Sequence, residues 1–266
     1  MRIIDVHTHF FPDSIAKETI RTLEAEGRGK SASDGTSKSL KEFMATDNVS
    51  VSVNAPVATK KEQVKGINRK MIEFNGNSRD IICFGAMHPD FSSIGNVKEE
   101  VEFMAKNGIK GIKLHADYQD FYPDDMKLYG IYDSCRKNNI AILFHAGKDP
   151  AFKEARATPE RLAQVAKIDG LKVIFAHMGS LGMWEDVVKH LVGKKVYFDT
   201  SDTVKTGNNL FKEIVIKHGT DKILFGSDFP WARASDIIKK VEETVNYAVA
   251  REMIFHKNAE ELLNLS

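Results

Sequence analysis

Short runs of apolar residues alternate with longer amphipathic stretches along most of the chain. Eight of these runs are five or six residues long and rich in β-branched and aromatic residues, as buried parallel strands are. They cover residues 3–7, 49–53, 81–86, 111–115, 140–145, 172–177, 196–200 and 223–228. Apolar residues recur at helical spacing between several of them, at 97–108, 126–139, 158–170 and 209–219. The pattern therefore predicts strands and helices in alternation.

The spacing of the strands narrows the fold class. From the second strand onward, the strand ends recur at intervals of 29 to 33 residues, with one shorter interval of 22. This is the length of one strand–helix unit, and eight such units make a closed (β/α)8 TIM barrel. An open doubly wound sheet would also alternate, but neither a GxGxxG turn nor a Walker-type loop follows any strand. We therefore predict an α/β protein with a TIM barrel.

The whole chain, residues 1–266, is expected to form this single domain. The stretch 13–48 is longer than one crossover needs, and its middle, EGRGKSASDGTSKS at 26–39, has almost no apolar residue. We expect 13–48 to be a long loop or lid over the mouth of the barrel. The segment 251–265 reads as one or two closing helices.

Composition excludes several classes of protein. The formal charge of +1 leaves no excess of basic residues for a nucleic acid or an anionic membrane. No apolar run approaches the length of a membrane span, and the first residues do not have the pattern of a secretory signal. Cys83 and Cys135 lie far apart in apolar or helical context, which is typical of buried thiols in a reducing compartment. We expect a cytoplasmic protein.

The placement of histidine carries the chemistry. Five of the nine histidines end or directly follow predicted strands, namely His7, His9, His115, His145 and His177. In a barrel that end of the strands holds the active site. The HxH pair alone is weak evidence, but strand alternation puts both imidazoles on one face. Asp228 ends the last predicted strand, the barrel neighbour of the first. Nitrogen and oxygen ligands of this kind predict a divalent ion, zinc first, with manganese, iron or cobalt as substitutes.

The motifs DVHTHFFP, GIKLH, LFHAG, IFAHMG and LFGSDFP, in that order, resemble the amidohydrolase superfamily. The branch they are most similar to is the amidohydrolase-2 group, which contains hydrolases and metal-dependent nonoxidative decarboxylases. The likeness covers the chain from Asp5 to the closing KNAEELLNL. The motif set is specific for the superfamily and unspecific for a substrate.

The resemblance implies roles for individual positions. His7 and His9 are similar to the paired metal ligands, His145 to the third ligand and Asp228 to the fourth. His177 resembles the histidine beside a mononuclear metal that positions or deprotonates its water. Binuclear members carry a carboxylated lysine or a glutamate near strand four. Lys113 stands two residues before the end of GIKLH, so a bridging carbamate and a lining or structural lysine both stay open.

The expected reaction is hydrolysis of an amide, lactone or ester of a small molecule by metal-activated water. Asp228 would take the proton of the water, and His177 would stabilise the oxyanion. Side chains considered for substrate binding are His115, Lys113, Arg156 and Arg233, together with Lys148 and with Trp184 and Trp231 as pocket walls.

Two other functions stay open. The alternative reaction is nonoxidative decarboxylation of a small aromatic or unsaturated carboxylic acid, with His177 or Asp228 as the proton donor. The decarboxylases typically show Pro-Trp after the strand-five histidine, whereas this chain has HAGKDPAF. A barrel retained as a binding protein is the third possibility. Family members are often dimers, so a homodimer is also open.

Overall fold

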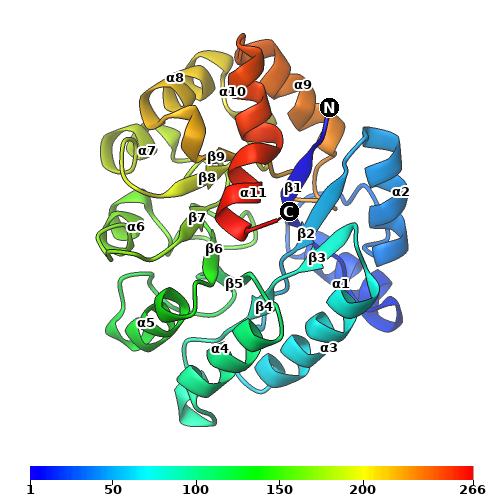
Figure 1. The fold of residues 1–266 in the computed structure, drawn as a ribbon, viewed down its shortest axis with the longest axis vertical. Helices are drawn as coiled ribbons and strands as arrows, with labels where there is room; N and C mark the ends of the chain where they lie inside the picture. The colour runs from blue at the N-terminus through cyan, green and yellow to red at the C-terminus, as the bar shows by residue number, and fades with distance from the viewer. Residues whose placement is uncertain (266) are drawn as a thin grey trace.

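The computed structural model describes residues 1–265 and has a ring of parallel strands at its centre (Figure 1). The strands are β1 (Ile4–Thr8), β2 (Val51–Asn54), β3 (Ile81–Cys83), β4 (Gly85–Ala86), β5 (Gly111–His115), β6 (Ala141–His145), β7 (Val173–Phe175), β8 (Tyr197–Asp199) and β9 (Ile223–Leu224). Strands β1 to β3 pair in order, and so do β4 to β9. All of these pairs are parallel. The order along the chain is thus the order around the ring.

Two seams close the barrel. Strands β3 and β4 are separated only by Phe84, whose backbone N–H donates to the Asn54 carbonyl at 2.9 Å, so together they form the third barrel strand. At the other seam, the Val6 N–H donates to the Phe225 carbonyl at 2.9 Å, and the Asp228 N–H to the His7 carbonyl at 2.8 Å. The predicted (β/α)8 barrel is confirmed. The second seam also brings Asp228 beside the HxH pair.

The helices surround this ring (Figure 1). They are α1 (Asp13–Ala25), α2 (Ser37–Asp47), α3 (Gln63–Asn77), α4 (Val97–Lys106), α5 (Tyr129–Lys137), α6 (Pro159–Val165), α7 (Trp184–His190), α8 (Asn208–His218), α9 (Ala234–Thr244), α10 (Ala248–Glu252) and α11 (Asn258–Leu263). Short 3-10 turns cover Phe91–Ser93, Met126–Leu128, Thr203–Lys205 and Thr220–Lys222, and a π-helical turn covers Met253–Lys257. The predicted helices at 97–108, 126–139, 158–170 and 209–219 are present, the third of them shortened to seven residues.

The stretch 13–48 is mostly helical, which corrects the expectation of a long loop. Helix α1 buries Ala16 and Ile20, and α2 buries Leu40 and Met44, so each has an apolar face. The Thr36 side chain accepts a hydrogen bond from the Ser39 N–H and caps α2. Only 26–36 remains irregular. Each helix has amphipathic spacing in the sequence, but the polar linker at 26–36 made the whole stretch read as a loop.

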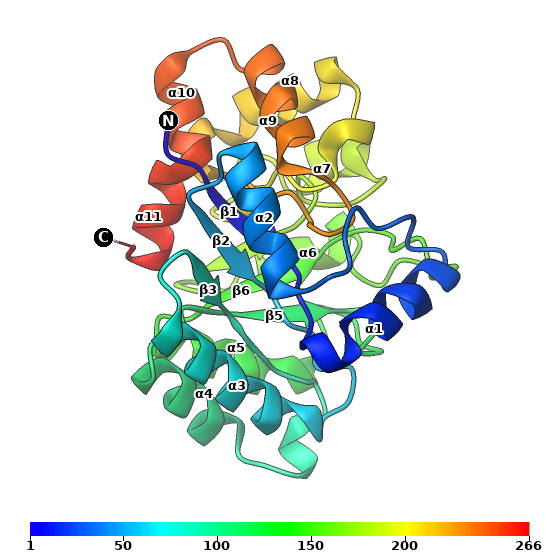
Figure 2. The same cartoon turned by 90° about the vertical axis from the view of Figure 1, so that its right-hand side faces the viewer.

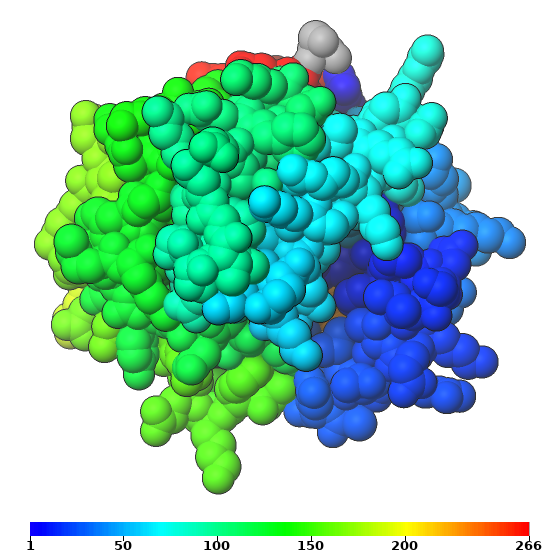
Figure 3. Space-filling model, turned by 90° about the horizontal axis from the view of Figure 1, so that it is seen from below, coloured from blue at the N-terminus to red at the C-terminus, as the bar shows by residue number. Residues whose placement is uncertain are grey.

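The two ends of the barrel differ. Helix α11 lies across the end where the strands begin, and its Leu262 and Leu263 pack on the apolar interior of the ring. Figure 2 shows α1 and the long connecting segments at the opposite end, where the strands finish. Seen from below, the surface is hollowed between the dark blue residues of α1 and the sky-blue chain that leads into α3 (Figure 3). Within the described residues, no helix is long and apolar enough to span a membrane. Cys83 and Cys135 are buried free thiols, as predicted.

Candidate metal centre

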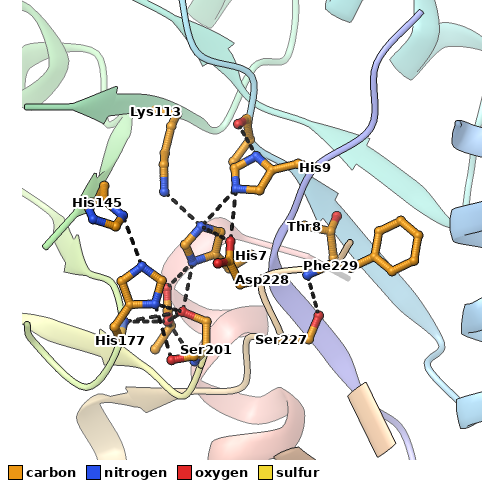
Figure 4. A network of polar contacts seen from close by, with 12 residues as sticks. His7, Thr8, His9, Lys113, His145, His177, Ser201, Ser227, Asp228 and Phe229 are labelled. Atoms are coloured by element: carbon orange, nitrogen blue, oxygen red, sulfur yellow. Dashed lines mark hydrogen bonds and ion pairs between the residues drawn. The ribbon is translucent and has the colours of Figure 1, made fainter. Parts of the chain in front are cut away.

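The carboxyl ends of the strands place a group of buried polar side chains at the barrel mouth (Figure 4). His7 comes from β1 and His9 directly follows it, Lys113 comes from β5, and His145 ends β6. His177 and Asp228 stand two and four residues after β7 and β9, both at positive φ. These turns bend the chain over the strand ends, so their side chains point back into the mouth.

Three of the predicted ligands converge on one point. The Nε2 atoms of His7 and His9 are 3.2 Å apart, and they lie 3.4 and 3.2 Å from Asp228 Oδ1. This Asp228 oxygen is buried and has no hydrogen-bond partner among residues 1–265. Burial alone would raise the pKa of Asp228, but the charge of Arg28 and the adjacent His7 hold it well below its usual range. The carboxylate is therefore ionised and directed at two imidazoles.

Hydrogen bonds on the far side of each ring fix the tautomers. His9 Nδ1 is 2.9 Å from the Ala55 carbonyl, which can only accept, so this nitrogen carries the proton. His7 Nδ1 is 2.9 Å from Asp199 Oδ2, and the same reasoning applies. Burial lowers the pKa of both histidines, which keeps the rings neutral. Both Nε2 lone pairs then face Asp228 Oδ1. Carboxylate or carbonyl partners behind ligating histidines are the usual arrangement around a bound metal, and this donor set fits a divalent ion.

Lys113 supplies a positive charge at this point. Its side chain is buried, and Nζ donates to His7 Nε2 at 2.8 Å. Burial lowers the pKa of Lys113 to about 8, with the carboxylates of Asp228 and Asp199 opposing that shift. The ammonium reduces the repulsion between the imidazole lone pairs and the Asp228 carboxylate. Lys113 therefore contacts a candidate metal ligand.

The fourth predicted ligand, His145, lies to one side of the other three. Its Nδ1 is 3.1 Å from His177 Nε2, and its Nε2 is buried with no hydrogen-bond partner in the described part of the chain. The His145 ring stacks on His115 with centroids 4.1 Å apart, and these two belong with Asp149 to a second group of donors. The structure thus brings His7, His9 and Asp228 together and places His145 in the neighbouring group.

His177 is held in place from behind. Ser201 donates its hydroxyl proton to Asp199 and accepts from His177 Nδ1 at 2.9 Å. The backbone N–H of His177 also donates to Asp199 Oδ1 at 3.0 Å. Burial lowers the pKa of His177 to about 4. The imidazole is therefore neutral and fixed beside His145.

Sequence reasoning missed two residues of this site, Asp199 and Arg28. Asp199 ends β8 and orients both His7 and His177, and its position in VYFDTS, at a strand end, was the available signal. Arg28 forms ion pairs with Asp149 and, at 3.4 Å, with Asp228. Nothing in the polar segment around Arg28 distinguishes it from a solvated cation.

Several residues considered for substrate binding have other partners. Arg156 pairs with Asp120, and Arg233 pairs with Asp47 of α2, each at 2.5 Å. His115 lies inside the mouth, with Nε2 3.3 Å from Asp149 Oδ2. Lys148 and Trp184 line a separate cavity of about 630 Å³ between the loops after β6 and β7. Trp184 also donates its indole N–H to the His177 carbonyl at 2.9 Å.

The family model described as Amidohydrolase matches residues 4–265, which is nearly the whole chain. This chain belongs to the amidohydrolase family. Membership supports an enzymatic role and an expected divalent metal, in agreement with the donor set at the mouth. No curated protein sequence matches this amidohydrolase.

Solved structures share its fold at low sequence identity. The amidohydrolase is similar to 5-carboxyvanillate decarboxylase from Novosphingobium aromaticivorans with manganese and 4-hydroxy-3-methoxy-5-nitrobenzoic acid (TM-score 0.74, 14% identity, 99% of this chain and 96% of that chain covered). It is also similar to 2,6-dihydroxybenzoate decarboxylase from Rhizobium (TM-score 0.72, 15% identity, 100% of this chain and 99% of that chain covered). A third similar structure is an uncharacterised TIM-barrel protein from Bordetella bronchiseptica (TM-score 0.77, 16% identity, 99% of both chains covered).

Proposed function

We propose that this amidohydrolase is a divalent-metal-dependent, nonoxidative decarboxylase of a small aromatic or unsaturated carboxylic acid. The metal would be held by His7, His9 and Asp228, with His145 as the further ligand that the family resemblance implies. Manganese and zinc both suit these donors. The names of two similar solved structures, both decarboxylases of aromatic acids, favour this reaction over hydrolysis.

The balance of buried charge is the observation that carries the proposal. Three carboxylates, Asp199, Asp228 and Asp149, are linked at the mouth through His7 and Arg28. The cations in this network are Arg28 and Lys113. Two cations against three carboxylates leave one negative charge, and a divalent ion turns this into one positive charge. The imidazoles add none, because burial keeps them neutral. A metal-loaded mouth therefore favours an anionic substrate, as a carboxylic acid is at neutral pH.

The chain's own residues suggest how the reaction would proceed. A bound divalent ion would supply Lewis acidity to the substrate's carboxylate or an adjacent hydroxyl. The bond to the carboxyl carbon then breaks, its electron pair stays on the substrate carbon, and carbon dioxide leaves. That carbon must receive a proton. Asp228 is ionised and His177 is neutral, so neither has a proton to give readily. Lys113 is the best placed proton donor to that carbon, because its ammonium group lies at the mouth beside His7.

Hydrolysis is the second candidate, because Asp228 is ionised and could act as a base. An ionised carboxylate with an unpartnered buried oxygen is what a base needs to accept a proton from an attacking water. His177 would then stabilise the developing oxyanion of an amide, lactone or ester. The sequence HAGKDPAF after β6, in place of Pro-Trp, also favours this reading.

The two reactions have different products, so a direct assay separates them. Protein loaded with Mn²⁺ or Zn²⁺ is incubated with a panel of aromatic and unsaturated carboxylic acids, and with matched esters, lactones and amides. The proposal expects carbon dioxide release and, in D₂O, deuterium on the carbon that lost the carboxyl group. Asp228→Asn should abolish turnover, whereas Arg233→Gln, whose partner is Asp47 of α2, should retain it. Carbonyl hydrolysis without carbon dioxide release would refute decarboxylation and support the second candidate.

A further inference from the structure

Residues 26–32 form a strap across the barrel mouth between α1 and α2. At one end, the Tyr118 hydroxyl donates to Glu26 Oε2 at 3.1 Å, which ties the strap to the segment after β5. At the other end, the Ala32 N–H donates to the Pro230 carbonyl at 2.8 Å, which ties it to the segment after β9. The strap thus crosses above the candidate metal ligands.

Arg28 is the side chain that the strap sends into the mouth. It is only 9% exposed, and its guanidinium lies 5.4 Å from the centre of the Trp231 ring. One end of the guanidinium pairs with Asp149 Oδ2, and the other lies 3.4 Å from Asp228 Oδ2. Two buried carboxylates from opposite sides of the mouth thus share one cation.

Glycines flank Arg28 on both sides. Gly27 and Gly29 have φ of +97° and +105°, which other residues adopt only with strain. A Cβ at Gly29 would meet nothing within 4 Å, and one at Gly27 would meet only the Pro150 carbonyl at 3.8 Å. Backbone conformation, and not crowding, therefore requires these glycines. They leave the backbone beside Arg28 free to change its dihedral angles.

The two oxygens of Asp228 face different partners. Oδ1 faces the imidazoles of His7 and His9, and Oδ2 faces the guanidinium of Arg28. We propose that Arg28 is an internal counter-cation of Asp228 that a divalent ion displaces, so that metal binding and closure of the strap oppose each other. This inference rests on the metal site of the proposed function, and it describes how that site is regulated.

The opposition follows from charge. Arg28 and a divalent ion are both drawn to the same carboxylate, and they repel each other across a buried, weakly screened distance. Asp149 gives the guanidinium a second partner, so Arg28 can move away from Asp228 without becoming an unpaired buried charge. Linkage is reciprocal: if the strap weakens metal binding, metal binding weakens the contacts of the strap by the same factor. An arginine that metal has freed from Asp228 is also available to an anionic substrate.

The test measures metal affinity and strap exposure, neither of which requires a known substrate. Dissociation constants for Mn²⁺ and Zn²⁺ are measured by competition with a chelator for the wild type, Arg28→Gln and Arg28→Lys. Arg28→Gln should bind metal about tenfold tighter or more, since it removes a unit charge close to a dication. Arg28→Lys keeps the charge and should stay within about threefold of wild type. Arg156→Gln, which removes a cation paired with Asp120 at the rim, is the matched control and should not change affinity.

Hydrogen exchange on the wild type gives an independent readout that needs no variant. The amide of Ala32, now bonded to Pro230, should exchange faster with Mn²⁺ than without it. The inference is overturned if Arg28→Gln binds metal equally or more weakly, because Arg28 would then serve only to orient Asp228. Unchanged or slower exchange of the strap on metal binding would overturn it as well. If no variant binds either metal, the proposed function fails instead, so the two failures are distinguishable.

Discussion

Gly147 lies two residues after His145, where the loop that follows β6 touches the loop that follows β7. Its φ is +92°, and a Cβ there would lie 2.2 Å from the Leu181 nitrogen and 2.5 Å from the Leu181 oxygen. Ordinary contacts are longer by about 1 Å or more, and backbone atoms cannot rotate away. Overpacking of this kind costs about 1–3 kcal/mol, and the left-handed backbone adds about 1–2 kcal/mol. We therefore expect Gly147→Ala to lower the free energy of unfolding by about 3 kcal/mol.

Thermal unfolding checks this value, and the same pair of loops provides a control. For a chain of this size, 1 kcal/mol corresponds to roughly 2–4 °C, so Gly147→Ala should lower the Tm by roughly 6–12 °C. Gly182 has a φ of +72° with nothing within 4 Å of a Cβ. Gly182→Ala should therefore show the backbone cost alone, about 1–2 kcal/mol. Equal shifts in the two variants would refute the reasoning, because the contact with Leu181 would then contribute nothing. Gly147 lies two residues after His145, and Leu181 lies four residues after His177. Because Gly147→Ala pushes these two loops apart, it should also displace the two imidazoles and impair the site.

Three further predictions concern charged and titratable groups. Burial lowers the pKa of His218 to about 4, so the unfolded chain, with a pKa of about 6.5, binds more protons between these values and stability falls as pH drops from 6.5 towards 4. Between pH 7 and pH 5, the free energy of unfolding measured in urea should therefore fall by about 2 kcal/mol less for His218→Gln than for the wild type. An equal fall in the two proteins would contradict the lowered pKa of His218. Asp199→Asn, which weakens the acceptor behind His7, should reduce metal affinity about 10–100-fold in a chelator competition; an unchanged affinity would mean that His7 is not a ligand. Arg233→Gln, whose partner is Asp47 on α2, should leave kcat/KM within about twofold, and a larger loss would return Arg233 to the substrate site.

The barrel could be predicted from the sequence because its strands are buried on both faces. Such strands read as continuous apolar runs, and the regular interval between their ends reports the strand–helix unit. The positions of His7, His9 and Asp228 followed from the same pattern, since strand ends meet at one mouth. Helices α1 and α2 both escaped detection, because the polar linker between them made the whole stretch 13–48 look like a loop. His218 also misleads: its place on a helix suggests the surface, yet its ring is buried against Phe198.

The finer geometry of the mouth is set by contacts between distant segments. His145 ends its strand as predicted, but its ring turns toward His177 and His115 and not toward the HxH pair. Whether a strand-end imidazole faces one neighbour or another depends on rotamers and hydrogen bonds that no local pattern encodes. Arg28 is the clearer case. Its partners Asp149 and Asp228 lie 121 and 200 residues away, so only the folded chain makes it part of the site.

The central claim is that the HxH pair and Asp228 hold a divalent ion, and metal content tests it most directly. After equilibration with Mn²⁺ or Zn²⁺ and exhaustive dialysis, elemental analysis should find about one ion per chain. The double variant His7→Ala/His9→Ala should bind none, while His190→Ala/His256→Ala, which removes two histidines outside the mouth, should match the wild type. A wild-type protein without metal, or a His7→Ala/His9→Ala variant that keeps it, would contradict the account.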